Sequence, residues 1–325
     1  MAKLALILPY FGQWPDWFPL YLDGLARMDF DVLCFTDLQI GEHPANFIVK
    51  RMSIGEMRTL AERKLGIPVN LVWTRKLCDL KPMYGHIFED FITGYDYWAY
   101  GDCDLVYGVM LNDVLKGVLA GEHDVISFRR CWMSGPFCIL KNTPSMRLLY
   151  REAGDLVRIL ASPWYEFFDE LGGDWFGSLL AGRMSVEECG RRRKSFSAVL
   201  WRQTSVSFFH EDVLSEDALL GGETIEMRSG KLTRNGREIP VFHFVNSKKA
   251  GSFRIGFRMC GQKKVSDYRI TRVGFFAPED WTQRFRITLC REVWGGMLDL
   301  RAFIRCARGV AWRRLAALAK REAGR

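Results

Sequence analysis

The chain has 325 residues, of which 46 are Lys or Arg and 38 are Asp or Glu, giving a formal net charge of +8. Eleven of the basic residues and three of the acidic ones lie between residues 284 and 325, so residues 1–283 hold 35 of each. A nucleic-acid-binding domain carries its basic surface on the folded body, so this balance argues against a nucleic-acid partner. With 48% hydrophobic residues, the chain has enough apolar material for a large core.

The cysteines and the apolar runs predict a cytoplasmic location. Nine cysteines are scattered without a C-x-x-C pair, which favours reduced thiols over a disulfide framework or a zinc site. The apolar run at residues 4–8 is too short for a signal peptide and is broken by Pro9. No other run reaches the roughly 18 apolar residues that a membrane-spanning helix needs.

The N-terminal part predicts a nucleotide-binding α/β unit. Residues 4–11 form a nearly continuous apolar run, which is typical of a strand buried on both faces of a parallel sheet. A helix is expected at residues 16–28 and a second buried strand at 32–36, which ends just before Asp37. Strand, helix and strand within so short a segment open many nucleotide-binding folds.

Helix and strand patterns alternate through the next hundred residues. Ser53 and Glu56 have the spacing of a capping box, which predicts a helix ending near residue 64. The remaining predicted helices are at 81–91, 111–119 and 144–160, and the remaining predicted strands are at 95–100, 124–128 and 137–140.

Two segments near the end of this region, 224–232 and 238–245, predict an antiparallel hairpin with an Asn235-Gly236 turn. The chain has no internal repeat and no low-complexity linker. We therefore predict one α/β domain over residues 1–270 and a separate basic, amphipathic helical tail over residues 271–325.

A pair of carboxylates, Asp102 and Asp104, follows the predicted strand at 95–100. Asp-x-Asp is a weak pattern, and a second copy at Asp29 and Asp31 precedes a strand and is interpreted as a turn. In an open α/β sheet, ligands bind at the carboxyl ends of the strands, where the first pair is expected. Two carboxylates there suit Mg²⁺ or Mn²⁺, which neutralises a departing diphosphate. The alternative is a turn in which both side chains accept local amide protons.

The motifs around this pair resemble those of a known family. They are Lys76–Gly85, containing Asp-Leu-Lys-Pro, and Gly94–Gly108, containing Asp-Cys-Asp, with further matches at 134–137, 168–170 and 241–244. Over roughly residues 4–250 the chain resembles bacterial polysaccharide-biosynthesis glycosyltransferases of the GT-A fold, many of which are known only as an uncharacterised glycosyltransferase-like domain. The resemblance implies an α/β fold of this type, with a Rossmann-like, mostly parallel sheet flanked by helices.

The resemblance also implies a metal-dependent transferase that uses a nucleotide diphosphate sugar, with a UDP-sugar favoured, and Mn²⁺ or Mg²⁺. Asp102 and Asp104 correspond to the metal-binding motif, Asp102 contacting the donor as well, and His243 to a late histidine that completes the metal shell. Lys248 would then lie near the diphosphate. From its residues alone, His243 is equally consistent with a histidine satisfied within the core.

Further site residues follow from the same resemblance. Asp37 occupies the position that recognises the nucleotide base or ribose, and Lys81 corresponds to a contact with donor phosphate or sugar. Asp169 and Glu170 are the candidate catalytic residues, which either hold the acceptor hydroxyl or act as base. The implied acceptor is a cell-surface polysaccharide or a lipid-linked oligosaccharide. Lys81 also fits a solvated residue at a helix start, although a cation is poorly placed there without an anion nearby.

Two alternatives come from other features. Asp102 and Asp104 fit the motif of haloacid-dehalogenase-type phosphatases, with Asp102 as nucleophile, but that motif usually follows the first strand. Residues 298–325 have apolar side chains at helical spacing among arginines, a pattern that suits an anionic membrane surface. We expect the enzyme to lie peripherally on the inner membrane through this segment. The segment also fits a helix packed on its own domain, or a membrane-attached scaffold without catalytic activity.

Overall fold

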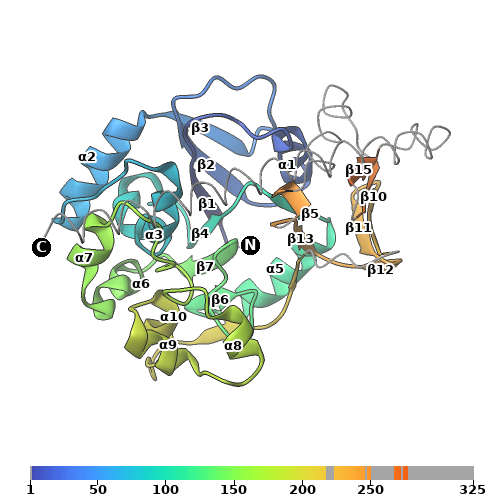
Figure 1. Cartoon of the computed structure of the whole chain (residues 1–325). Coiled ribbons are helices and arrows are strands. Elements are labelled where there is room, and N and C mark those ends of the chain that lie inside the picture. The colour runs from blue at the N-terminus through green and yellow to red at the C-terminus, as the bar shows by residue number, and fades with distance from the viewer. Residues whose placement is uncertain (1, 217–222, 246, 250–266, 272–273, 277–325) are drawn as a thin grey trace, which may run out of the picture. The chain divides into compact units, whose positions relative to one another are not determined.

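The fold is taken from a computed structural model that describes residues 2–216, 223–245, 247–249, 267–271 and 274–276 (Figure 1). The chain divides into two units by its internal contacts. Unit 1 comprises Met1–Ser215 and Glu238–His243, and unit 2 comprises Glu216–Arg237 and Phe244–Arg325. Most of the predicted tail, including residues 298–325, lies outside the described residues, so the predicted domain boundary stays a prediction. Within the described part, no helix is both long and apolar enough to cross a membrane.

A seven-stranded, mainly parallel sheet forms the centre of unit 1, in the order β3-β2-β1-β4-β7-β6-β8. Only β7 runs antiparallel, to both of its neighbours β4 and β6. The predicted α/β class with a mostly parallel sheet is therefore confirmed. The strands are β1 Leu4–Pro9, β2 Asp31–Thr36, β3 Phe47–Arg51, β4 Tyr97–Gly101, β6 Val125–Ser127, β7 Phe137–Lys141 and β8 Phe208–His210.

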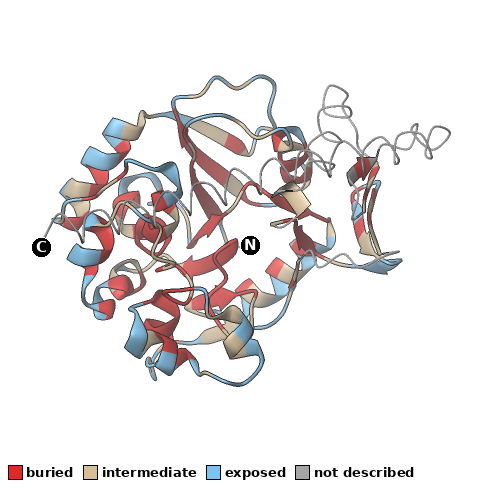
Figure 2. Cartoon of the chain, viewed as in Figure 1, coloured by how far each residue is buried: buried red, intermediate tan, exposed pale blue. Residues whose placement is uncertain are grey.

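Helices cover both faces of this sheet because its central strands are apolar on both sides. Leu6 of β1 belongs to a buried cluster with residues of α1 (Phe18–Leu25) and α5 (Met110–Ala120). Ile7, its neighbour, belongs to a second cluster with residues of α2 (Ile54–Leu65). Figure 1 accordingly places α1 and α5 on one side of the sheet and α2 on the other, and Figure 2 shows the strands between them as buried.

The predicted capping box at the start of α2 is confirmed. The Glu56 backbone N–H donates to Ser53 Oγ at 3.2 Å, and the Ser53 N–H donates to Glu56 Oε2 at 2.7 Å. Gly66 ends the helix in the left-handed conformation, with φ of 68°, which glycine adopts without a steric penalty.

The single helix predicted at residues 81–91 is wrong, because this region is a series of short turns. The helical conformation is lost at Phe88, whose φ of −105° and ψ of 20° separate the turn before it from the turn after it. The turns are η1 Thr74–Lys76, α3 Leu77–Leu80, η2 Lys81–Met83, α4 Tyr84–Ile87 and η3 Glu89–Phe91.

The helix predicted at residues 144–160 is also interrupted. It consists of α6 (Pro144–Leu148), η4 (Leu149–Ala153) and α7 (Leu156–Ala161). Gly154 and Asp155 between the last two have positive φ angles of 64° and 55°, which no right-handed helix contains. Short helices follow in the region that has no clear sequence pattern, namely α8 Phe176–Leu180, α9 Val186–Arg192 and α10 Phe196–Leu200.

The predicted hairpin of residues 224–232 and 238–245 is confirmed at its Asn235-Gly236 turn, where β11 and β12 are neighbours, but the rest of the predicted pairing is wrong. In unit 2, β10 (Thr224–Arg228) pairs with β11 (Lys231–Arg234), and the Asn235-Gly236 turn leads from β11 into β12 (Arg237–Glu238). The same sheet contains β14 Tyr268–Thr271 and β15 Gly274–Phe276, and η5 Ser247–Lys249 follows β13 in the chain.

The next strand, β13 (Val241–His243), belongs to a separate three-stranded sheet, in the order β5-β13-β9. It pairs antiparallel with β5 (Leu105–Tyr107), and His243 lies opposite Leu105. The third strand of this sheet is β9 (Leu214–Glu216). This pairing brings a late segment of the chain next to the residues that follow β4.

Candidate active site

Two of the predicted site residues, Asp37 and Asp102, lie at one edge of the central sheet. β1, β2 and β4 run parallel, so their carboxyl ends lie at the same edge. Asp37 follows β2 and Asp102 follows β4, and β1 lies between these two strands. Asp37 is exposed, and its backbone carbonyl accepts a hydrogen bond from Arg51 at 3.4 Å.

Asp102, Asp104 and His243 come together beside this edge. Each offers one potential ligand atom, and these atoms all lie within 4.8 Å of one another. The two aspartates occupy the short connection between β4 and β5. His243 joins them because β13 pairs with β5, which places it opposite Leu105, the residue after Asp104.

The chemistry of this group fits a divalent cation. Carboxylate oxygens are the preferred ligands of Mg²⁺, and the addition of an imidazole nitrogen also suits Mn²⁺. His243 Nε2 lies 3.2 Å from Asp104 Oδ2, and both side chains are nearly fully buried. Asp102 differs, because 32% of its side chain remains exposed. The group is therefore anchored on one side and open to a ligand on the other.

Lys81 is held between two carboxylates rather than at the surface. Its ammonium group donates to Asp102 Oδ1 at 2.6 Å and to the carbonyl oxygen of Gly135 at 2.8 Å. Asp169 Oδ2 lies 3.6 Å from the same nitrogen. The buried cation thus links the carboxylate at the end of β4 to the acidic pair predicted to be catalytic.

The acidic pair is positioned by Tyr165 and Gly135. The Tyr165 hydroxyl donates to Asp169 Oδ1 at 2.8 Å and lies 3.5 Å from Glu170 Oε2. The Gly135 N–H donates to Glu170 Oε1 at 3.3 Å. A Cβ atom at residue 135 would lie 2.7 Å from Glu170 Cδ, so the close approach of this carboxylate requires glycine.

Burial sets the charge states within this cluster. Burial alone would lower the pKa of Lys81, but Asp102, Cys78 and Asp169 outweigh it and hold that pKa well above its usual value. Burial raises the pKa of Asp169 well above its usual range, although Lys81 opposes the shift. Asp169 is buried, whereas Glu170 is only partly so. Of the two predicted catalytic residues, Glu170 is thus the one with solvent access.

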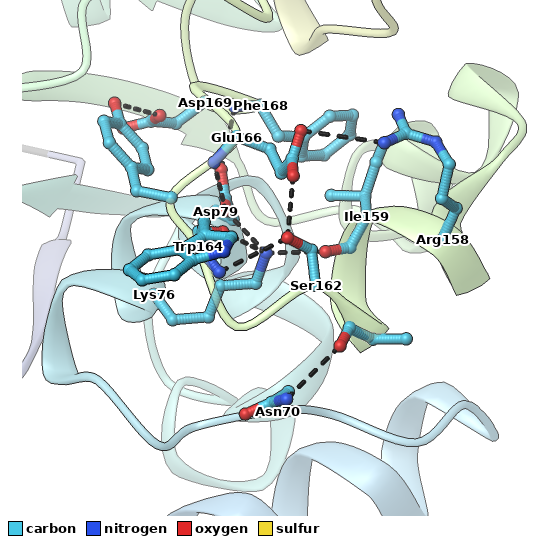
Figure 3. A network of polar contacts seen from close by, with 12 residues as sticks. Asn70, Lys76, Asp79, Arg158, Ile159, Ser162, Trp164, Glu166, Phe168 and Asp169 are labelled. Carbon is cyan, nitrogen blue, oxygen red and sulfur yellow. Dashed lines mark hydrogen bonds and ion pairs between the residues drawn. The ribbon is translucent and has the colours of Figure 1, made fainter. Parts of the chain in front are cut away.

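A second buried ion pair supports the segment that carries these acids (Figure 3). Lys76 Nζ donates to Asp79 Oδ2 at 2.8 Å and to the carbonyl oxygens of Ile159, at 2.5 Å, and Trp164, at 2.9 Å. Asp79 in turn accepts backbone N–H groups from Glu166 at 2.8 Å and Phe168 at 2.9 Å. The pair therefore fixes the backbone on both sides of Tyr165 and immediately before Asp169.

The structure brings five of the predicted site residues into two adjoining groups: Asp102, Asp104 and His243, and Lys81 with Asp169. Glu170 joins the second group through Tyr165. Asp37 lies at the same sheet edge, two strands from β4. Lys248 belongs to unit 2, where its backbone N–H donates to the Phe244 carbonyl at 3.3 Å.

Sequence reasoning did not identify Tyr165, Gly135, Lys76 or Asp79 as functional or supporting residues. Lys76 and Asp79 lie within the motif at 76–85, so their spacing was visible, but their partners come from residues 159–168. Tyr165 lies four residues before Asp169, in a region whose sequence predicts no regular structure. Gly135 is recognisable only from the side chain that packs against it.

Comparisons with known proteins give a matching family and a distant similarity to solved structures. A search of curated proteins returns no match. Among solved structures, the crystal structure of mouse xyloside xylosyltransferase 1 in its apo form matches with 9% sequence identity and a TM-score of 0.38. The match covers 76% of this chain and 98% of that chain. A family model described as a family of unknown function, DUF6625, matches residues 6–271. Because that match spans most of the chain, the protein belongs to the DUF6625 family.

Proposed function

We propose that this protein is a divalent-cation-dependent glycosyltransferase that takes its sugar from a nucleotide diphosphate sugar. The observation that carries the proposal is the convergence of Asp102, Asp104 and His243 at the carboxyl end of a parallel sheet. The motifs at 76–108 and 241–244 resemble those of GT-A transferases, and the pairing of β13 with β5 joins these two segments. A UDP-sugar, and a polysaccharide or lipid-linked acceptor, are proposed from the resemblance alone.

In this proposal Asp102, Asp104 and His243 hold Mn²⁺ or Mg²⁺. A bound cation would supply Lewis-acid stabilisation of the negative charge that grows on the diphosphate as it leaves the sugar. Asp104 and His243 are buried against each other, which fixes their orientation. The Asp102 carboxylate is partly exposed and so remains accessible to a ligand. Its ion pair with Lys81 limits its rotation.

Lys81 acts as a positioning residue. It is buried and bonded to Asp102 and to the Gly135 carbonyl, so we propose that it orients the metal-binding carboxylate rather than contacting donor phosphate. Glu170 is the acid proposed to meet the acceptor hydroxyl, since it is partly exposed and held by the Gly135 N–H. Asp169 is buried and supports Glu170 through Tyr165 and Lys81. As base, Glu170 would take the hydroxyl proton while the oxygen attacks the anomeric carbon.

The first experiment measures Mn²⁺-dependent hydrolysis and transfer with a panel of nucleotide sugars. Asp102→Ala and Asp104→Ala are expected to lower either rate by about 100-fold or more, because several kcal/mol of charge stabilisation are lost. Asp29→Ala is the matched control, since Asp29 begins the other Asp-x-Asp pattern and its side chain is largely exposed. Full activity in either site variant would refute the metal assignment.

The same protein preparation distinguishes the proposed transferase from the phosphatase alternative. A haloacid-dehalogenase-type enzyme with Asp102 as nucleophile would hydrolyse a phosphomonoester in the absence of any sugar nucleotide. In contrast, the proposed transferase should leave such a substrate untouched. Phosphate release from p-nitrophenyl phosphate that disappears in Asp102→Asn would favour the phosphatase.

A further inference from the structure

A cluster of basic side chains lies outside the acidic site in unit 1. We call it the basic hollow, and it measures about 420 Å³. Arg158 contributes from α7, Arg191 and Arg192 from the last turn of α9, and Arg193 and Lys194 from the segment that follows. Asp155 is the single acidic residue in its lining.

The basic hollow carries more positive charge than its neighbours neutralise. Arg158 Nε lies 2.6 Å from Asp155 Oδ2, and Arg193 Nη1 lies 3.1 Å from Glu166 Oε2. Arg158 also lies 3.6 Å from the same Glu166 oxygen. Five cations therefore face two carboxylates in contact with them. Within the described part of the chain, Arg191, Arg192 and Lys194 form no ion pair, although Glu187 is close enough to Arg191 to interact with it electrostatically.

Helix-end electrostatics explains part of this charge. The carbonyl end of a helix carries a partial negative charge, which favours Arg191 and Arg192 in the last turn of α9. Arg192 also stacks over Trp175, with 5.5 Å between its guanidinium carbon and the ring centroid. Arg158, from another helix, is balanced by Asp155 and Glu166, but neither helix-end effect accounts for Lys194, which lies beyond the end of α9. The convergence of five cations on one hollow favours an anion there.

We propose that the basic hollow binds a phosphate group of a ligand, at a site distinct from Asp102, Asp104 and His243. Guanidinium groups bind phosphate through two parallel N–H donors, and lysine adds a compact charge. The volume lies within the range of small-molecule sites and exceeds what a single phosphate needs, so a diphosphate or a phosphorylated headgroup fits. A free diphosphate and a phosphorylated lipid headgroup both present phosphate oxygens to the basic side chains. The proposal does not depend on the transferase function.

The basic hollow is connected to the acidic site through the segment 166–172. Glu166 binds Arg193 with its carboxylate and Asp79 with its backbone N–H, as the network in Figure 3 shows in part. A Cβ atom at Gly172 would lie 2.9 Å from the Lys194 carbonyl oxygen, so the two segments pack directly together. A phosphate in the hollow would compete with Glu166 for Arg193. Glu166 lies three residues before Asp169.

The test measures binding of inorganic pyrophosphate to the full chain by calorimetry in EDTA, so that no divalent cation can contribute. The variant is Arg191→Gln with Lys194→Gln, which removes two of the three lining cations that form no ion pair. The matched control is Arg58→Gln with Arg63→Gln, which removes the same charge from the exposed face of α2. Both pairs are exposed, and an unchanged Tm confirms folding.

We expect wild type and control to bind pyrophosphate and the hollow variant to bind at least about tenfold more weakly, since a charge-assisted hydrogen bond contributes about that factor. A second arm measures sedimentation with phosphatidylglycerol vesicles, with phosphatidylcholine vesicles as reference. Loss of vesicle binding in the hollow variant alone would identify a lipid headgroup as the phosphate source. Equal losses in both variants, or no change in either arm, would overturn the proposal.

Discussion

Two buried lysines, Lys76 and Lys81, lie five residues apart and each binds an aspartate, yet their surroundings differ. Lys76 and Asp79 are fully buried and 2.8 Å apart. Lys81 is nearly as buried, but its partner Asp102, at 2.6 Å, keeps about a third of its side chain exposed. One pair is closed to solvent, whereas the other ends at a surface where a ligand can bind.

The hydrogen-bond partners of Lys76 and Asp79 also show that this pair is closed to ligands. All three donors of Lys76 are used by Asp79 and two carbonyl groups, and Asp79 also accepts two backbone N–H groups. This pair thus joins the 76–79 turn to the 164–168 segment and leaves nothing for a ligand. The same motif therefore provides a support at Lys76 and a site component at Lys81. Substitutions should separate the two roles.

The largest effect is expected for Asp79→Ala. It leaves Lys76 as a buried cation without its carboxylate and frees two buried N–H groups, so we expect a loss of about 3–5 kcal/mol in the free energy of unfolding. Urea denaturation measures this loss. Asp90→Ala is the control, because Asp90 forms an ion pair with Lys64 at 2.8 Å but is largely exposed. It should cost much less than Asp79→Ala, because water screens an exposed ion pair. Equal losses in the two variants would contradict the supporting role of Asp79.

Lys81→Met should act on function more than on folding. Without the ammonium group, Asp102 loses its orienting contact, and we expect transferase activity to fall by about 100-fold, equivalent to about 2.7 kcal/mol. Asp102 can hydrate and Asp169 can take up a proton, so the stability loss should be smaller than that of Asp79→Ala. Lys64→Met, which also removes a paired lysine, is the control. An active Lys81→Met enzyme would show that Asp102 needs no such partner.

Gly135→Ala is designed to displace Glu170 without removing a polar group from the site. The added methyl group meets the flexible end of that side chain, which can move aside, so the fold should lose less than about 1 kcal/mol. We expect activity to fall by about tenfold because the carboxylate shifts from its place. Gly117→Ala provides the comparison, since nothing lies within 4 Å of a Cβ there and the helix α5 should gain stability. If both variants keep full activity, Glu170 is not the base.

The smallest effect is expected for Tyr165→Phe. It removes the hydroxyl that donates to Asp169 and should cost about 1 kcal/mol in unfolding free energy. Because that hydroxyl acts to lower the pKa of Asp169, its removal should raise this pKa further. Urea denaturation at neutral pH measures the cost. A variant as stable as wild type would show that the bond contributes nothing net.

Much of the fold was predictable because its signals are local. The apolar runs of β1 and β2 and the capping box at Ser53 depend only on neighbouring residues, and the structure has each of them. β3 (Phe47–Arg51) was missed, since only its first residue is fully buried and it ends in Lys50 and Arg51. The breaks at Phe88 and Gly154 were hidden within helical periodicity, because tertiary contacts, not propensity, decide there.

The site required pairings between distant parts of the chain. Asp102 and Asp104 were found from their place after a strand, and His243 from the family resemblance. The pairing of β13 with β5, which joins them, was not predicted, because the hairpin pattern at 224–245 indicated a local partner instead. Tyr165 acts through Asp169, four residues away, in a region without a clear pattern, and Gly135 acts through Glu170, 35 residues away.

The most direct test of the account is calorimetric titration of the purified full chain with Mn²⁺. We predict binding of one ion to wild type and to Asp29→Ala, and at least about tenfold weaker binding to Asp104→Asn and to His243→Gln, because each removes one of three ligands. Mn²⁺ affinity that is the same in all four proteins, or no Mn²⁺ binding to wild type, would contradict a cation site formed by Asp102, Asp104 and His243.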